Sequence, residues 1–284
     1  MKKEKLNFDE IHYWSEVKLD IIRDYASEYS KILSKQTQID HSYIEGFAGA
    51  GIHISKSSGK NISGSPVNAL NINPPFKKYY FIDLKQSRTK NLELLAKGNP
   101  NVFVYQGNCN EILLQEVFPK VEYKNFQRAL CVLDPYGLHL DWNVIEKAGK
   151  MKSIEIFLNF PIMDMNQNIL WHQPEIVTPQ QIERMNDYWG DESWRTAVYQ
   201  KDQNLFNLDW LKKEPESNEK IATAFQERLK RVAGFSYVPD PIPMRNSKGA
   251  TVYYLFFASQ NPVGGKIVKH IFDKNKDKGA GHNG

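Results

Sequence analysis

Cysteine is scarce in this chain of 284 residues, and long apolar runs are missing. The two cysteines, Cys109 and Cys131, are too few for a disulfide framework or a cysteine-based metal cluster, so we expect free thiols in a reducing compartment. No run approaches the roughly 18 apolar residues that a membrane span needs. The lysine-rich start leads into polar sequence, not into the apolar core of a signal peptide. These absences predict a soluble cytoplasmic protein without a membrane partner.

Charge of one sign is not in excess either. The 37 basic and 33 acidic side chains give a net charge of +4, which indicates a nucleic-acid partner only if the fold gathers positive charge on one surface. Hydrophobic residues make up 41% of the chain and charged residues 25%, which excludes a disordered or collagen-like protein. At roughly 100–200 residues per domain, the length fits one large domain or one domain with an insertion.

Five short apolar runs alternate with helical patterns, after an opening helix whose apolar residues recur from Trp14 to Leu33. The alternation is typical of a doubly wound α/β domain with a parallel sheet, in which ligands bind at the carboxyl ends of the strands. The predicted strands cover residues 42–45, 79–82, 101–105, 129–133 and 154–158. The predicted helices cover residues 65–70, with Ser65 as the cap, 87–96, 110–118 and 142–150, with Asp141 as the cap.

The pattern divides the chain into five parts. We predict a helical N-terminal extension, a cofactor-binding core, a mostly helical insertion rich in tryptophan, a C-terminal completion of the core sheet and a disordered tail. These parts cover residues 1–40, 41–161, 162–217, 218–272 and 273–284. The fourth part is expected to contain a charged helix over 218–232, a strand segment near 236–238, a buried strand over 251–257 and a closing helix over 262–272.

A glycine-rich segment, Glu45–Gly51, follows the first strand and predicts a cofactor site. It contains G-x-x-G-x-G, not the G-x-G-x-x-G of dinucleotide-binding folds. Its small residues allow a ligand to approach the backbone, and Glu45 can accept hydrogen bonds from an ammonium or hydroxyl group. The alternative is a tight turn without a ligand. The predicted cofactor-binding residues are Glu45, Phe47, Gly49, Gly51, Asp83 and Asn108.

Asp83 and Asn108 follow the next two strands. In nucleoside-binding α/β folds, an acid at the position of Asp83 accepts hydrogen bonds from ribose hydroxyls, although it can also be a helix cap. Asn108 lies where an acid or amide would contact an adenine amino group. Both residues therefore favour a ligand that contains a nucleoside.

The stretch Asp134-Pro135-Tyr136-Gly137 follows the fourth strand and predicts the reacting centre. Proline holds Asp134 extended and removes a backbone donor, so the carboxylate and nearby carbonyls are presented to a ligand. Such acceptors would orient an exocyclic amine, and Tyr136 would stack on its ring. The alternative is an ordinary turn. We predict Asp134, Pro135 and Tyr136 as catalytic residues and Asn159, Phe160 and Pro161 as substrate-binding residues. Since no zinc-ligand spacing or nucleophilic triad is present, we expect no metal.

In their order along the chain, these motifs resemble the three-Cys-motif partner (TcmP) family of prokaryotic and mobile-element proteins. The resemblance covers most of the chain and is carried by residues 14–21, 45–51, 64–66, 133–137, Trp142, 159–161 and 253–258. One departure from the expected pattern is Asn108, where an aspartate would follow Gly107.

The resemblance implies the class I fold of S-adenosylmethionine-dependent methyltransferases, which is Rossmann-like. Its mostly parallel seven-stranded sheet has a final antiparallel strand, and helices cover both faces. Asp134–Gly137 is similar to the Asp-Pro-Pro-Tyr of amino-methyltransferases and the Asp-Pro-Phe-Gly of tRNA guanine-N2 methyltransferases. It thus implies S-adenosylmethionine as cofactor and methylation of an exocyclic amine on a DNA or RNA base, and the family name implies a cysteine-containing partner protein.

Two other functions stay open at this point. One is a non-catalytic protein of this fold that binds nucleic acid or a partner protein. The other is a small-molecule methyltransferase with the tryptophan-rich insertion as a lid. A nucleic-acid substrate is favoured if the lysine-rich C-terminus and the cluster Arg228, Lys230 and Arg231 converge on the rim of the Asp134 site.

Overall fold

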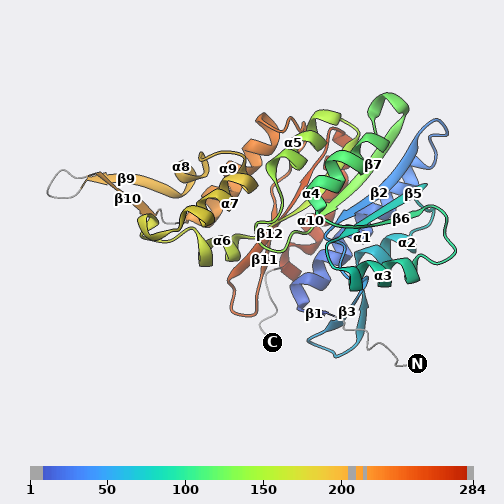
Figure 1. The fold of residues 1–284 in the computed structure, drawn as a ribbon, viewed down its shortest axis with the longest axis horizontal. Helices are drawn as coiled ribbons and strands as arrows, with labels where there is room; N and C mark the ends of the chain where they lie inside the picture. The colour runs from blue at the N-terminus through green and yellow to red at the C-terminus, as the bar shows by residue number, and fades with distance from the viewer. Residues whose placement is uncertain (1–8, 204–208, 214–215, 280–284) are drawn as a thin grey trace.

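A sheet of seven strands forms the centre of the protein (Figure 1). The computed structural model describes residues 9–203, 209–213 and 216–279. The strand order is β11-β12-β8-β7-β2-β5-β6, and β12 runs antiparallel between β8 and β11. The strands are β2 (Asp40–Gly46), β5 (Lys78–Asp83), β6 (Val102–Gln106), β7 (Gln127–Leu133), β8 (Ile154–Phe160), β11 (Ile242–Arg245) and β12 (Thr251–Ala258). This mostly parallel seven-stranded sheet with its antiparallel strand, flanked by helices, confirms the expected Rossmann-like α/β fold.

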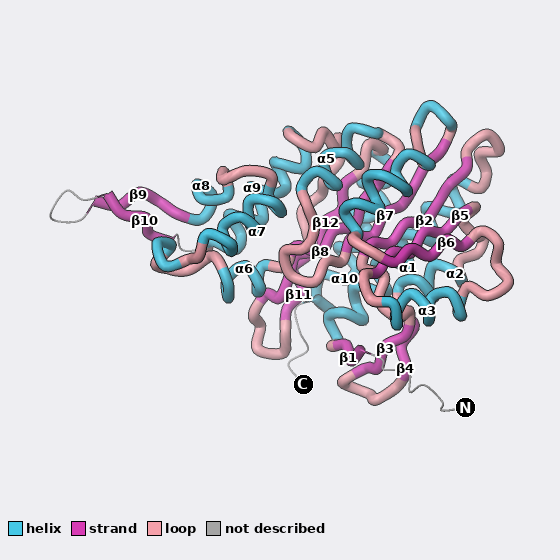
Figure 2. Tube along the Cα trace, in the orientation of Figure 1, coloured by secondary structure: helices cyan, strands magenta, loops and turns pink. Residues whose placement is uncertain are grey.

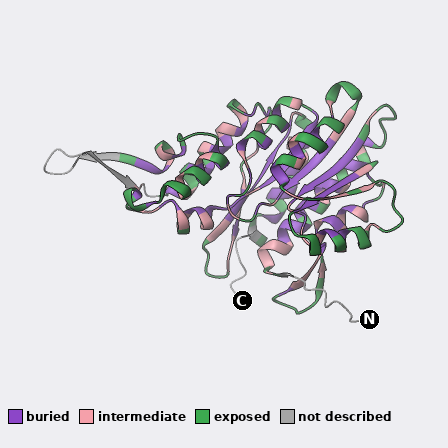
Figure 3. Cartoon of the chain, viewed as in Figure 1, coloured by how far each residue is buried: buried purple, intermediate pink, exposed green. Residues whose placement is uncertain are grey.

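Helices cover both faces of the sheet. Side chains alternate along each strand, so one face packs against α1, α2, α3 and α10, and the other against α4, α5 and α9. The bounds are α1 (Tyr13–Leu33), α2 (Ser65–Leu70), α3 (Gln86–Leu95), α4 (Cys109–Ile112), α5 (Trp142–Met151), α9 (Ser217–Arg231) and α10 (Pro262–Gly279). Short π and 3-10 turns follow α4 over Leu113–Val117, Phe118–Lys120 and Tyr123–Asn125. Figure 3 shows the buried central strands between helices whose outer sides are exposed, an arrangement that produces near-continuous apolar runs in the sequence.

The insertion consists of helices and a hairpin. The hairpin, formed by β9 and β10, was not expected, and it projects away from the sheet (Figures 1 and 2). The elements are α6 (Ile162–Asn168), a 3-10 turn (Pro174–Ile176), α7 (Pro179–Trp189), α8 (Trp194–Val198), β9 (Tyr199–Gln203) and β10 (Asp209–Lys213). Trp189 and Trp194 are buried in the core shared with the sheet. These two tryptophans therefore stabilise the insertion, and they do not form a surface on which bases would stack.

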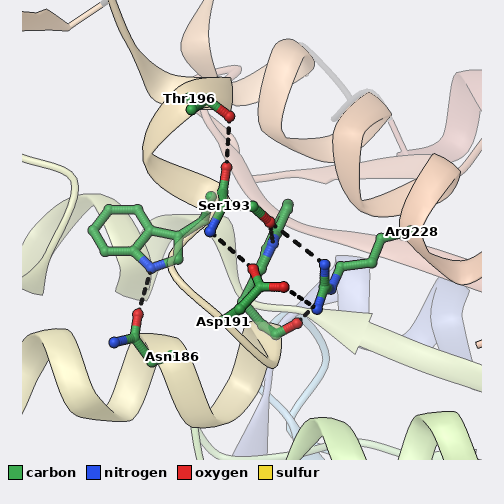
Figure 4. A network of polar contacts seen from close by, with 7 residues as sticks. Asn186, Asp191, Ser193, Thr196 and Arg228 are labelled. Carbon is green, nitrogen blue, oxygen red and sulfur yellow. Dashed lines mark hydrogen bonds and ion pairs between the residues drawn. The ribbon is translucent and has the colours of Figure 1, made fainter. Parts of the chain in front are cut away.

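Arg228 fastens the insertion to α9 (Figure 4). Its Nη2 lies 2.8 Å from Oδ2 of Asp191, and its Nε donates to the carbonyl oxygen of Trp189 at 2.6 Å. The guanidinium also lies over the Trp142 ring, 4.6 Å from its centroid. Arg228 thus joins α5, α7 and α9 through one side chain.

A second, small sheet lies beside the glycine-rich segment. It contains β1 (Asp9–Ile11), β3 (Ile52–Ser55) and β4 (Asn61–Ser63), in which β1 is parallel to β3. These strands were not predicted because they are only three or four residues long, too short for an apolar pattern to identify a strand. They connect the beginning of the described chain to the segment that follows Gly51.

The structure differs from several predicted details. Gly64, not Ser65, is the N-cap of α2. Asp141 is at the N-cap of α5 as predicted, but its side chain makes no capping hydrogen bond. The segment 236–238 contributes only an isolated bridge between Tyr237 and Ser259. Residues 273–279 of the predicted disordered tail continue α10, while 280–284 lie outside the described residues.

Within the part of the chain that is described, no helix has the length and apolar character needed to cross a bilayer.

Candidate active site

The predicted site residues gather where the strand order of the sheet reverses. β2 lies between β5 and β7, with Gly46 beside Ile82 on one side and Leu133 on the other. Asp83, the last residue of β5, and Asp134, which follows β7, therefore lie at the carboxyl edge on either side of the glycine-rich turn. This is the place where open α/β sheets bind their ligands.

The turn after β2 has an unusual backbone. Phe47, Gly49 and Gly51 all have positive φ, with values of 64°, 68° and 80°. Such a conformation is free for glycine but costs a residue like Phe47 of order 1 kcal/mol. Gly46 is required by space, since a Cβ there would lie 2.5 Å from Sγ of Cys109. The segment is thus a tightly packed turn that brings backbone groups close to the site.

Asp83 holds this turn in place. Its Oδ2 accepts the backbone N–H of Gly49 at 2.9 Å, and its Oδ1 accepts that of Lys85 at 2.8 Å. Nη1 of Arg88 lies 3.5 Å from Oδ2. Because Gly49 and Arg88 already lie against Oδ2, Oδ1 is the oxygen of Asp83 that can still accept a hydrogen bond from a ligand hydroxyl. Asp83 is not the cap of α3, because Lys85 occupies that position.

Glu45 is a buried carboxyl group between the turn and Asp134. Its Oε1 accepts the Ser65 hydroxyl, and its Oε2 accepts the Tyr43 hydroxyl at 3.1 Å. Burial raises the pKa of Glu45 to about 8, against the lowering effect of these two hydrogen bonds. The neighbouring Asp134 charge raises it further, so Glu45 is mainly protonated at neutral pH.

Asp134 forms an ion pair that was not predicted. Lys18 of α1 donates to its Oδ2, and Nδ2 of Asn159 donates to its Oδ1 at 2.7 Å. Burial raises the pKa of Asp134, but the charge and hydrogen bond of Lys18, with the hydrogen bond from Asn159, outweigh it and hold the pKa below its usual value. Asp134 is therefore ionised at neutral pH and can accept hydrogen bonds.

Lys18 is the site residue that sequence reasoning missed. In the sequence it is a polar residue between the apolar positions of the opening helix, yet in the fold it is only 8% exposed. The signal lies in the spacing, because Trp14, Lys18, Ile21 and Tyr25 recur on one helical face. A lysine within an apolar stripe indicates an acidic partner elsewhere in the fold.

The residues around Asp134 differ in how they face the solvent. Tyr136 is 88% exposed and Pro135 is buried. Asn159 lies within β8, and its Oδ1 is buried without a hydrogen-bond partner. Phe160 is buried in the core, 4.7 Å from the centroid of the Phe225 ring. Phe160 thus has a packing role, and a contact of Phe160 with a substrate stays a prediction.

Pro161 is likewise buried, at the N-cap of α6. Of the three residues predicted to bind substrate, Asn159 is the one whose polar group reaches Asp134. Asn108 is exposed, and its Oδ1 accepts the backbone N–H of Asn110 at 2.9 Å as the cap of α4. A contact of Asn108 with adenine stays a prediction.

His53 of β3 is a second residue that was not predicted at the site. Its charge contributes to the lowering of the Asp134 pKa, and its Nε2 would lie 3.0 Å from a Cβ at Gly64. The small sheet thus brings an imidazole to the glycine-rich turn. Among the described residues, no group of three or more His, Cys, Asp or Glu side chains is arranged to hold a metal ion.

The basic cluster of α9 makes its contacts with the chain's own acids. Arg228 pairs with Asp191, and both Lys230 and Arg231 pair with Glu227. The cation that reaches the carboxylate after β7 comes instead from α1. Convergence of this cluster on the site, which would favour nucleic acid, therefore has no support from these contacts.

Comparison with known proteins gave remote likenesses in fold. No family model matches the chain, and no curated protein matches it. A Legionella pneumophila protein of the family model DUF519 matches with 12% identity and a TM-score of 0.46, over 91% of this chain and 92% of that chain. A putative methyltransferase from Thermobifida fusca matches with 11% identity and a TM-score of 0.40, over 84% and 80% of the two chains. The 23S rRNA methyltransferase ErmE gives 8% identity and 0.36, over 86% and 68%.

Proposed function

We propose that this protein is an S-adenosylmethionine-dependent methyltransferase that methylates an exocyclic amine. The observation that carries the proposal is the position of Asp134, which is held ionised by Lys18 and Asn159 next to the glycine-rich turn. An ionised carboxylate accepts hydrogen bonds from an amine, and it needs no metal or nucleophilic side chain to orient one.

The residues of the turn suit a nucleoside cofactor. Oδ1 of Asp83 keeps an acceptor site for a ribose hydroxyl. The half-buried Gly49 leaves its backbone accessible, whereas Gly51 is buried against Leu92 and Leu95. Glu45 would face the amino-acid end of the cofactor, and Asn108 would lie near its adenine. When bound, S-adenosylmethionine supplies the methyl group, and the protein supplies binding and orientation.

At the acceptor side, Asp134 and the Pro135 carbonyl would orient the amine, while Tyr136 would cover its ring. Lys18 already donates a hydrogen bond to Oδ2 of Asp134. The amine would donate to the second lone pair of the same oxygen. Alignment of this kind contributes up to roughly 7–11 kcal/mol in well-oriented reactions.

We further propose that the protein belongs to the TcmP family and that its acceptor is a DNA or RNA base. It would act in the cytoplasm, together with a cysteine-containing partner protein. The support is the order of the motifs, from Trp14 through Asp134 to the strand at Tyr253. The exposed ring of Tyr136 offers a surface on which a base would stack. A base in a duplex would have to be flipped out or presented in a single strand.

Titration calorimetry with S-adenosylmethionine tests the cofactor assignment. We expect wild-type protein to bind, and Asp83→Asn to bind at least tenfold more weakly because one ribose acceptor is lost. Asp141→Asn is the matched control, since Asp141 has no side-chain capping bond. The assignment fails if the wild type does not bind or if Asp83→Asn binds as tightly as the wild type.

A further inference from the structure

A cavity of about 610 Å³ lies at the amino edge of the parallel strands, opposite the candidate active site. It is enclosed by α1, by the start of α10 and by the first residues of β7 and β8. Residues that line it include Tyr29, Ile32, Arg128, Lys152, Ser153 and Glu155. This volume is within the roughly 300–1,000 Å³ of small-molecule sites.

The strand register places three polar side chains on one side of this cavity. Leu130 of β7 pairs with Glu155 of β8, and the backbone N–H of Ala129 donates to the carbonyl oxygen of Ser153 at 2.8 Å. Because side chains alternate along a strand, Arg128, Ser153 and Glu155 share the face that α1 and α10 cover. The cavity therefore has a polar floor beneath an apolar and aromatic wall.

Ser153 carries an unsatisfied group. The residue is 2% exposed, and its Oγ has no hydrogen-bond partner in the described structure. Buried hydroxyl groups are nearly always paired, so an unpaired one that lines a cavity indicates a partner from outside the chain.

Two cations of the cavity are not paired with an acid, in contrast to their neighbours. Lys124 and Lys150 form ion pairs with Glu122 and Glu146. Arg128 instead lies over the ring of Tyr123, 3.8 Å from its centroid, and neither Arg128 nor Lys152 has a carboxylate partner among residues 9–203, 209–213 and 216–279. Both cations are therefore available to an anionic group.

Glu155 is already satisfied by the chain itself. Its Oε2 accepts the Tyr25 hydroxyl, and its Oε1 accepts the Ser259 hydroxyl at 2.8 Å. Burial raises the pKa of Glu155, against the lowering effect of the hydrogen bonds from Tyr25 and Ser259. It therefore does not require a cationic ligand.

We propose that this cavity is a second binding site, for a small amphipathic organic anion. The anionic group would bind Arg128 and Lys152, Ser153 would hydrogen-bond to it, and the apolar body would pack against Tyr29 and Ile32. The site is separate from the proposed methyl-transfer site, so the two proposals stand or fall independently.

The test uses 8-anilinonaphthalene-1-sulfonate, an aromatic anion whose fluorescence rises on binding, with the full chain and saturating S-adenosylhomocysteine. The neutral probe N-phenyl-1-naphthylamine has the same aromatic body without the sulfonate. We expect Arg128→Gln with Lys152→Gln to weaken binding of the anion about tenfold, the effect of losing hydrogen bonds to charged groups. The neutral probe should bind this double variant as it binds the wild type.

The matched control is Lys124→Gln with Lys150→Gln, which removes the same charge next to the cavity and should leave binding unchanged. Ser153→Ala should weaken binding of the anion without lowering the melting temperature, because it removes an unpaired hydroxyl. The proposal is overturned if the wild type binds no anion, if both double variants weaken binding equally, or if the neutral probe loses as much affinity as the anion.

Discussion

Lys18 on the opening helix donates a hydrogen bond to Asp134 at the end of β7, 116 residues further along the chain. The pair connects the N-terminal helix to the loop that we propose as the reacting centre. Because Lys18 keeps the Asp134 pKa below its usual value, the helix controls the charge of the proposed acceptor site. The N-terminal extension is thus part of the site.

Removing this cation should destabilise the fold. Lys18→Met leaves the Asp134 carboxylate, which is partly buried, without its ion pair, and we expect a loss of about 1–3 kcal/mol in the free energy of unfolding. Chemical denaturation at neutral pH measures it. The double variant Lys18→Met with Asp134→Asn should recover part of the loss, since no uncompensated charge remains. An unchanged free energy in Lys18→Met would show that the pair contributes nothing.

Glu45 should make stability fall as the pH rises. Its pKa in the folded protein, about 8, is above its ordinary value of 4.5, so the folded state keeps a proton that the unfolded state has lost. This contribution is complete below about pH 4.5 and is lost as the pH rises through 8, at no more than about 1.4 kcal/mol per pH unit. Glu45→Gln, which resembles the protonated form, should flatten the pH dependence between pH 5.5 and 8.5 in urea denaturation. Equal slopes in both proteins would contradict this.

Gly46 should tolerate no side chain while Cys109 is present. Gly46→Ala places a Cβ 2.5 Å from Sγ of Cys109, and we expect a loss of about 1–3 kcal/mol from overpacking. The substitution Cys109→Ala removes the sulfur, so Gly46→Ala should cost much less stability in the Cys109→Ala background than in the wild type. A double-mutant cycle by thermal denaturation measures the coupling, and additive losses would mean that the two groups do not clash.

Arg228 should contribute more to the free energy of unfolding than Arg231, because it connects the insertion to α9. Arg228→Met removes the bonds to Asp191 and Trp189 and should cost about 1–3 kcal/mol in unfolding free energy. Arg231→Met is the control, because that side chain is 81% exposed and its pair with Glu227 is on the surface. Its loss should be below about 1 kcal/mol. Similar losses in the two variants would refute the special role of Arg228.

The sequence was most informative where burial is complete. The five predicted strands of the parallel sheet are confirmed because helices on both faces require continuous apolar runs, as in β7 from Ala129 to Leu133. The hairpin of β9 and β10 and the small sheet around His53 were missed, since their pairing and position, not a local apolar pattern, define them. Lysine-rich residues after Phe272 were taken for a disordered tail, although Asn275 is buried and bonds back to Ile271 within α10.

In the candidate site, too, local patterns in the sequence were predictive and contacts between distant residues were not. The positions of Glu45, Asp83 and Asp134 were predictable because each lies at, or directly after, the carboxyl end of a strand of a parallel sheet. The partner of Asp134 was not, since Lys18 is distant in the chain and reads as an ordinary polar residue of a helix. The predicted cap, Ser65, instead donates its hydroxyl hydrogen bond to Glu45.

Transfer of a radiolabelled methyl group from S-adenosylmethionine tests the central claim most directly. Wild-type protein, Asp134→Asn and Asp141→Asn would each be incubated with single-stranded and duplex DNA and RNA, with and without the three-Cys-motif protein. We predict that the wild type and Asp141→Asn label a nucleic acid. Asp134→Asn should label it at least about a hundredfold less while still binding the cofactor. Equal labelling by Asp134→Asn, or cofactor binding by the wild type without labelling of any pool, would contradict the proposed methylation of a base.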